Sequence, residues 1–269
     1  MTNRQTSDLD RLRTRTWAMC VAAAVDEFSP TRLEKHLNNL LGDEFKDATG
    51  VWRSYCEGSS KPFKRRAVKP KAVWVDEVER LYPGTSRWFY TPVWYLLEET
   101  EFYPSEIYEC AKQLPHDELA EYLLSGEGLE ESAALMLSEL TMQVPWLLAV
   151  KPSPEALGAM ACAMRRAELA GQMPIFRRAG IGMLWLLDRL ILKEPLPVRE
   201  CLRELRKIVK EKFDKQVYPM GGLMRSPPKR RDLEEFSKRV KLLKAAEKAF
   251  DKCDMEKGES LIDQAFSIK

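Results

Sequence analysis

The chain has 269 residues, 43 basic and 41 acidic, for a formal net charge of +2. That length can bury the core of one large or two modest domains without a metal ion or disulfides, and a near-neutral total does not by itself mark a nucleic-acid-binding protein. The six cysteines lie far apart in the sequence, so no metal-binding pair such as CxxC occurs.

The opening ten residues are polar and mixed in charge, which is not typical of a secretory leader. The two most apolar windows, 140–150 and 181–192, are too short to cross a bilayer. We therefore expect a cytoplasmic protein that makes no membrane contact.

Charge is segregated along the chain. Residues 98–141 hold twelve acids against Lys112 alone, whereas residues 199–252 hold seventeen Lys or Arg against nine acids. An acidic middle and a basic end favour contacts with charged partners over uniform solvation. The acidic face, 98–139, is a candidate surface for a protein partner.

Helical spacing of apolar residues dominates the chain, and no pair of alternating segments predicts a β-hairpin. The fold class predicted is all-α, with a C-terminal helical hairpin whose Ala246, Phe250, Leu261 and Ala265 resemble the second half of a tetratricopeptide-type hairpin. We expect helices over 9–28, 30–42, 51–57, 72–82, 104–114, 115–125, 129–150, 154–171, 174–192, 202–215, 232–250 and 255–266. The predicted domains are an N-terminal region 1–100, an acidic then apolar core 101–195, and a basic region 196–269 with a mobile loop 218–231.

The stretch 48–71 carries the most specific functional pattern. Trp52 and Tyr55 lie three residues apart on one face of a short helix, and Gly58 ends that helix. A run of cations without an acid follows, and it repels itself unless a polyanion or salt screens it. The run comprises Lys61, Lys64, Arg65, Arg66, Lys69 and Lys71.

Within this stretch, Tyr55-Cys56-Glu57-Gly58 with Pro62 four residues later resembles the end of the recognition helix in Cro/cI-type helix-turn-helix repressors. Upstream, residues 29–42 are similar to the first helix of that motif. The segment 43–49 is longer than the turn of the family, and Gly50 stands where a helix interior is expected. The resemblance implies an N-terminal helix-turn-helix-like region that binds DNA.

Two functions follow from these patterns. The first is a DNA-binding accessory or regulatory protein that neutralises phosphates with its cations, while Thr49 or Arg53 reaches base edges. Two further basic stretches support this function: 11–15, and a second that comprises Arg225, Lys229, Arg230 and Arg231. The alternative is a non-catalytic helical scaffold that docks a protein through its acidic and basic faces.

An enzyme is not expected, because the chain has two isolated histidines and no phosphate loop or nucleophile beside a base. His36 falls on the polar side of its helix. No metal site and no cofactor are predicted.

Overall fold

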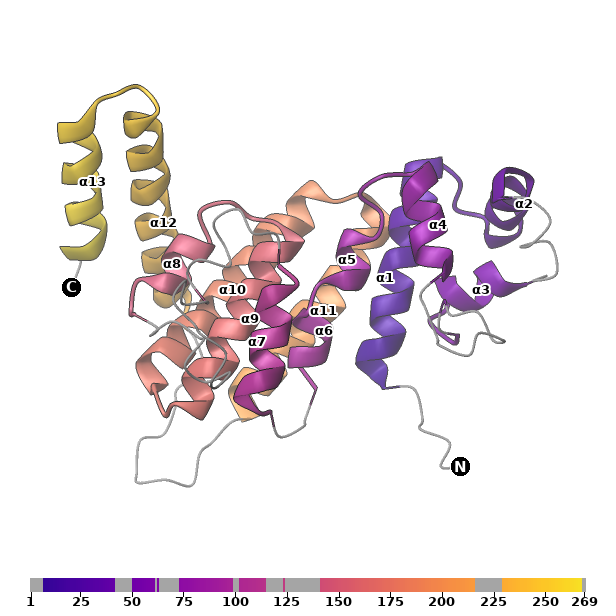
Figure 1. Ribbon diagram of the computed structural model, residues 1–269, viewed down its shortest axis with the longest axis horizontal. Coiled ribbons are helices and arrows are strands. Elements are labelled where there is room, and N and C mark those ends of the chain that lie inside the picture. The colour runs from indigo at the N-terminus through magenta and orange to yellow at the C-terminus, as the bar shows by residue number, and fades with distance from the viewer. Residues whose placement is uncertain are drawn as a thin grey trace. The chain divides into compact units, whose positions relative to one another are not determined.

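The computed structural model describes residues 7–41, 50–60, 62, 73–98, 102–114, 123, 141–215 and 229–267 (Figure 1). All regular elements in these ranges are helices, and no strand occurs in them. The prediction of an all-α fold is confirmed.

The chain divides into two compact units, Met1–Trp94 with Ile191–Leu205, and Tyr95–Leu190 with Arg206–Lys269. This division differs from the three consecutive ranges we expected, because 191–205 belongs with the N-terminal helices. The first half of α11 (Leu196–Lys215) accounts for the difference. Its Leu202 and Leu205 are fully buried, and its Glu204 pairs with Arg15 at 3.0 Å.

In addition to the first half of α11, the first unit contains α1 (Asp8–Val25), α2 (Pro30–Leu41), α3 (Val51–Cys56), α4 (Val73–Leu81) and α5 (Arg87–Tyr90). The hydroxyl of Ser7 caps α1 by accepting from the N–H of Asp10 at 3.1 Å. Apolar side chains at helical spacing on α1, α2 and α4 meet in one core, which includes Trp17, Val21, Leu33, Leu37, Val75 and Val78.

The second unit contains α7 (Pro104–Lys112), α8 (Val144–Leu148), α9 (Pro154–Leu169), α12 (Arg230–Phe250) and α13 (Met255–Ser267), while α6 (Val93–Leu96), α10 (Met173–Lys193) and α11 cross its boundary. Ser153 caps α9. Small side chains on α9 are completely buried, as expected for the apolar core. Pro145 lies in the first turn of α8, where its missing N–H costs no hydrogen bond.

The C-terminal hairpin is formed by α12 and α13, which lie side by side (Figure 1). Gly258 permits their close contact, since a Cβ there would lie 2.2 Å from the ring of Phe250. The rings of Trp146 and Phe266 stack at 6.0 Å and tie α13 to α8.

One predicted boundary in this region is wrong. We expected the loop 218–231 to continue through Arg231, whereas α12 already begins at Arg230. The carboxylate of Asp232 accepts from the N–H of Lys229 at 2.8 Å, and this cap sets the start of the helix.

In the part of the chain that the structure describes, no helix combines the length and the apolar character needed to cross a membrane.

Candidate nucleic-acid interface

A buried glutamate joins α2 to the start of α3. The carboxylate of Glu34, only 8% exposed, accepts from the N–H of Gly50 at 2.8 Å and from the N–H of Trp52 at 3.2 Å. The first N–H groups of a helix have no partner within the helix, and a negative charge there is favoured by the helix dipole. Glu34 therefore fixes the position of α3 against α2.

The inward side of α3 is aromatic. Trp52 and Tyr55 are both buried, with ring centroids 5.3 Å and 5.6 Å from that of Trp17. Trp74 of α4 meets Trp52 edge-on at 6.3 Å, and Phe89 meets Trp17 at 6.0 Å. Two large rings held this way fix the rotation of the short helix, so its remaining side chains must face outward.

The turn after α3 requires glycine, as the sequence predicted. Gly58 has φ of 69°, and a Cβ on it would lie 2.5 Å from the carbonyl oxygen of Arg11. Its backbone therefore touches α1 directly.

The outward side of the α2–α3 pair carries cations. Arg53 is 77% exposed at its side chain and pairs with Glu57 of the same helix at 3.0 Å. On α2, Arg32 and Lys35 are exposed, and neither forms an ion pair with another described residue. The spacing of Leu33 and Leu37, which face the core, could have identified these two cations from the sequence, because positions 32 and 35 lie on the other side of the helix at about 100° per residue.

Most of the predicted nucleic-acid-binding residues lie outside the described residues. Those outside are Thr49, Lys61, Lys64, Arg65, Arg66, Lys69, Lys71 and Arg225. Pro62 near the start of the cation run 61–71 and Trp74 just after its end are both buried, and Trp74 belongs to the core of the first unit. The chain thus enters and leaves this run at the same unit that carries α2 and α3.

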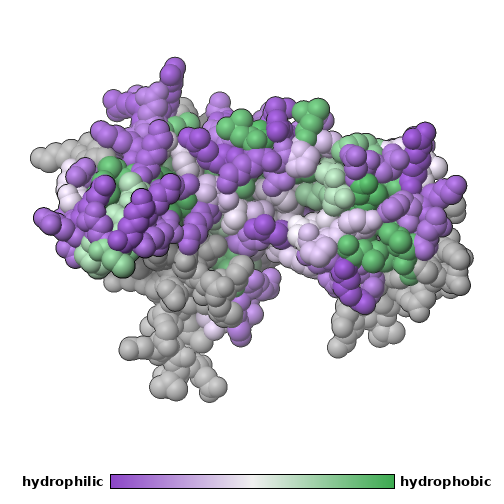
Figure 2. All heavy atoms as spheres, turned by 90° about the horizontal axis from the view of Figure 1, so that it is seen from above, coloured by the Kyte–Doolittle hydropathy of each residue, from purple (hydrophilic) through white to green (hydrophobic). Residues whose placement is uncertain are grey.

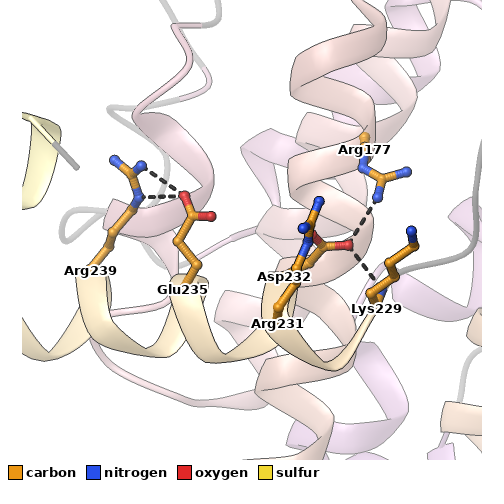
Figure 3. A network of polar contacts seen from close by, with 6 residues as sticks. All are labelled: Arg177, Lys229, Arg231, Asp232, Glu235 and Arg239. Atoms are coloured by element: carbon orange, nitrogen blue, oxygen red, sulfur yellow. Dashed lines mark hydrogen bonds and ion pairs between the residues drawn. The ribbon is translucent and has the colours of Figure 1, made fainter. Parts of the chain in front are cut away.

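The remaining predicted cations, at the start of α12, have acidic neighbours. Arg230 pairs with Glu234 at 2.7 Å, and Arg231 lies 4.0 Å from Asp232. Asp232 also binds Arg177 at 2.9 Å (Figure 3). Lys229, Arg230 and Arg231 belong to the second unit, whereas Arg53 belongs to the first.

Five of the six thiols are buried or half-buried, and that of Cys253 is exposed. All six cysteines are free, and burial raises the pKa of Cys56 and of Cys110 to about 11. Such thiols are protonated at neutral pH and are poor nucleophiles. Within the described ranges, no group of three or more His, Cys, Asp or Glu side chains could hold a metal ion.

No model of a known protein family matches the chain, and searches of curated proteins and of solved structures find no significant match.

Proposed function

We propose that the protein binds nucleic acid, with duplex DNA as the favoured ligand, through the α2–α3 pair and the cation run 61–71. The observation that carries the proposal is the Glu34 contact, which holds α3 rigidly on α2 while Arg32, Lys35 and Arg53 face solvent. A rigid helix pair with outward cations is one arrangement by which proteins contact a phosphate backbone.

The mechanism is phosphate neutralisation. Each cation that contacts a phosphate releases condensed counterions, so log affinity falls with log salt by about 0.9 per contact on duplex DNA. The ion pair between Arg53 and Glu57 is exposed, and such pairs contribute only about 0.3–0.5 kcal/mol. A phosphate or a guanine edge can therefore compete for Arg53 at small cost.

The test is fluorescence anisotropy with labelled duplex at about 50 mM salt, the low end at which phosphate contacts are strongest. The variant K64E/R65E/R66E should weaken binding to every sequence and flatten the salt slope by about three. The variant R32E/K35E should flatten it by about two, for the same reason.

Arg53→Ala should act differently. If its guanidinium reads a guanine edge, its loss costs about 1–3 kcal/mol on a preferred site and much less on random DNA. A preferred site would first be selected from a random duplex library. Failure of the unmodified protein to bind any duplex or single strand at low salt would eliminate the nucleic-acid function.

A helical scaffold that docks a protein partner is the second candidate. Its supporting observation is a pair of leucines at the connection between α10 and α11, Leu192 and Leu196, which are 68% and 63% exposed. Leu192→Ser with Leu196→Ser should abolish capture of a protein partner from native-host extract and leave DNA binding unchanged.

A further inference from the structure

The outward face of α12 carries a row of lysines that is separate from the α2–α3 pair. Lys238, Lys241 and Lys248 are exposed on the helix, and Lys252 follows directly after its end. At 100° per residue, the three helical lysines fall within a sector of about 80°. This sector lies opposite the side that buries Phe236, Val240 and Leu243. We call these four residues the lysine row.

Each acid of α12 binds a cation outside the lysine row, and Asp251 and Asp254, which flank Lys252 after the helix, form no ion pair with a row lysine among the described residues. Asp232 pairs with Arg177, Glu234 with Arg230, Glu235 with Arg239, and Glu247 with Lys151. Figure 3 shows two of these pairs, those of Asp232 and Glu235. None of the four ammonium groups of the lysine row forms an ion pair with another described residue.

The row repels itself as a result. Lys238 and Lys241 are three residues apart on the same helix face, where like charges destabilise a helix by about 0.2–0.5 kcal/mol per pair. An external polyanion would remove this repulsion and gain counterion release.

Two kinds of polyanion could bind the lysine row, an acidic protein or a nucleic acid, and the surroundings of the row favour a nucleic acid. A stable protein interface needs a buried apolar centre, but α12 exposes no large hydrophobic side chain. In Figure 2 the end of the molecule that carries α12 and α13 is covered mainly by hydrophilic side chains. From Lys238 to Lys248 the row extends about 15 Å at 1.5 Å per residue, a length that faces several backbone phosphates.

We infer that the lysine row is a second nucleic-acid-binding surface, which contacts the phosphodiester backbone without reading sequence. The inference stands on the charges of the second unit alone, so it does not depend on the α2–α3 pair. The ligand of this face is the phosphodiester backbone that DNA and RNA share. The experiments below compare single-stranded and double-stranded forms.

The test uses the full-length chain with K238E/K241E and a matched control, K207E/K210E. Both pairs consist of exposed lysines three residues apart on a helix, and both change the net charge equally, but Lys207 pairs with Glu211 at 3.7 Å whereas Lys238 and Lys241 form no ion pair with a described residue. In anisotropy titrations from about 50 to 200 mM salt, K238E/K241E should flatten the salt slope by about two, while K207E/K210E should leave it unchanged. Equal effects of the two pairs would overturn the inference, because net charge alone would then explain them.

Two further variants separate the possible failures. K238Q/K241Q removes the same two contacts without placing new acids beside Glu234 and Glu235, so it should reproduce the slope change even if the glutamate variant unfolds. R32E/K35E combined with K238Q/K241Q should lose slope additively if the two surfaces act independently. If R32E/K35E has no effect and K238Q/K241Q does, the α2–α3 proposal fails and the lysine row stands; the converse overturns the row.

The choice of nucleic acid over acidic protein is tested by competition. Duplex DNA, single-stranded DNA, RNA and polyglutamate of equal charge are titrated against the labelled complex. Nucleic acids should displace the probe at lower concentration than polyglutamate, by an amount that K238Q/K241Q reduces. Polyglutamate that competes equally well would overturn the inference and assign the row to acidic proteins.

Discussion

The two units differ in the charge that each buries. Among the described residues, the buried charged side chains are Glu34 in the first unit and Arg165 and Arg239 in the second. Glu34 accepts from backbone N–H groups, whereas the two arginines donate to backbone carbonyl oxygens. Buried backbone N–H and C=O groups must be paired. In the first unit a buried carboxylate pairs with N–H groups, and in the second unit buried guanidinium groups pair with carbonyl oxygens.

Because some charged residues are buried, the number of basic residues in the sequence overstates the number available on the surface. Arg165 donates to the carbonyls of Leu96 and Glu98, each at 2.6 Å, and its guanidinium lies 4.6 Å from the ring centroid of Phe102. Arg239 and Arg178 both lie against the ring of Trp146, at 4.2 Å and 4.0 Å. Burial, with Arg239 nearby, lowers the pKa of Arg178 to about 10. Arg165 and Arg239 therefore belong to the interior and cannot contact a polyanion.

The largest expected effect comes from removing a buried arginine. Arg165→Ala deletes two hydrogen bonds to backbone carbonyls and leaves Glu168, its partner at 2.7 Å, without that ion pair. Breaking a buried charged contact costs about 3–5 kcal/mol, which denaturant unfolding monitored by circular dichroism would detect. Arg53→Ala is the control, because its exposed ion pair contributes about 0.5 kcal/mol or less. Equal losses would contradict the distinction between interior and surface arginines.

The corresponding change in the first unit is Glu34→Ala. It leaves the N–H groups of Gly50 and Trp52 without their acceptor, and we expect a loss of about 2 kcal/mol in unfolding free energy. Glu27→Ala is a control of similar kind, since Glu27 is half-buried and, among the described residues, accepts only from the N–H of Ser29. Its loss should cost about 1 kcal/mol or less, as for other helix-start contacts. A cost for Glu34→Ala no larger than for Glu27→Ala would remove the anchoring role of Glu34.

The sequence was sufficient for most of the helices that the structure describes and for parts of the core, but α5 and α6 were not expected, α11 begins at Leu196 and not at Leu202, and the expected helix 115–125 lies outside the described residues except for Leu123. The spacing of Trp52, Tyr55 and Gly58 predicted a short helix and the turn after it, and the structure contains both. Local signals of this kind act within a few residues, so a single sequence displays them.

The buried charges could not be predicted in the same way. Glu34 resembles any acid on an amphipathic helix, and its partners Gly50 and Trp52 are 16 and 18 residues away. Arg165 bonds the carbonyl of Leu96 across 69 residues. Only the tertiary fold determines which charged residues meet unpaired backbone groups. For the same reason, the sequence alone does not show that the acids of α12 pair with cations outside the lysine row.

A glycine substitution tests how tightly the first unit is packed around α3. Gly58→Ala forces a Cβ to within 2.5 Å of the carbonyl oxygen of Arg11 at a φ of 69°. Gly84→Ala is the matched control, because Gly84 also has positive φ but a Cβ on it would meet no other atom within 4 Å. Left-handed backbone alone costs about 1–2 kcal/mol, so Gly84→Ala should lose that amount and Gly58→Ala distinctly more in thermal unfolding. Similar shifts in Tm would argue that α1 and α3 move apart readily.

The smallest expected effect is a pH dependence in the loop after α4. Burial acts to raise the pKa of Glu79, but hydrogen bonds from the backbone of Gly84 and from Ser86 and Thr85 outweigh it and lower the pKa. A carboxylate whose pKa is lower in the folded state stabilises the protein above its unfolded pKa of about 4.3, and this contribution is lost as pH falls through the folded pKa. Glu79→Gln should therefore be less stable than the unmodified protein at pH 6, by under about 1 kcal/mol because the site is largely exposed to solvent. The difference should shrink toward pH 3 in urea unfolding, and a difference that stays constant with pH would assign the effect of Glu79 to packing and not to its charge.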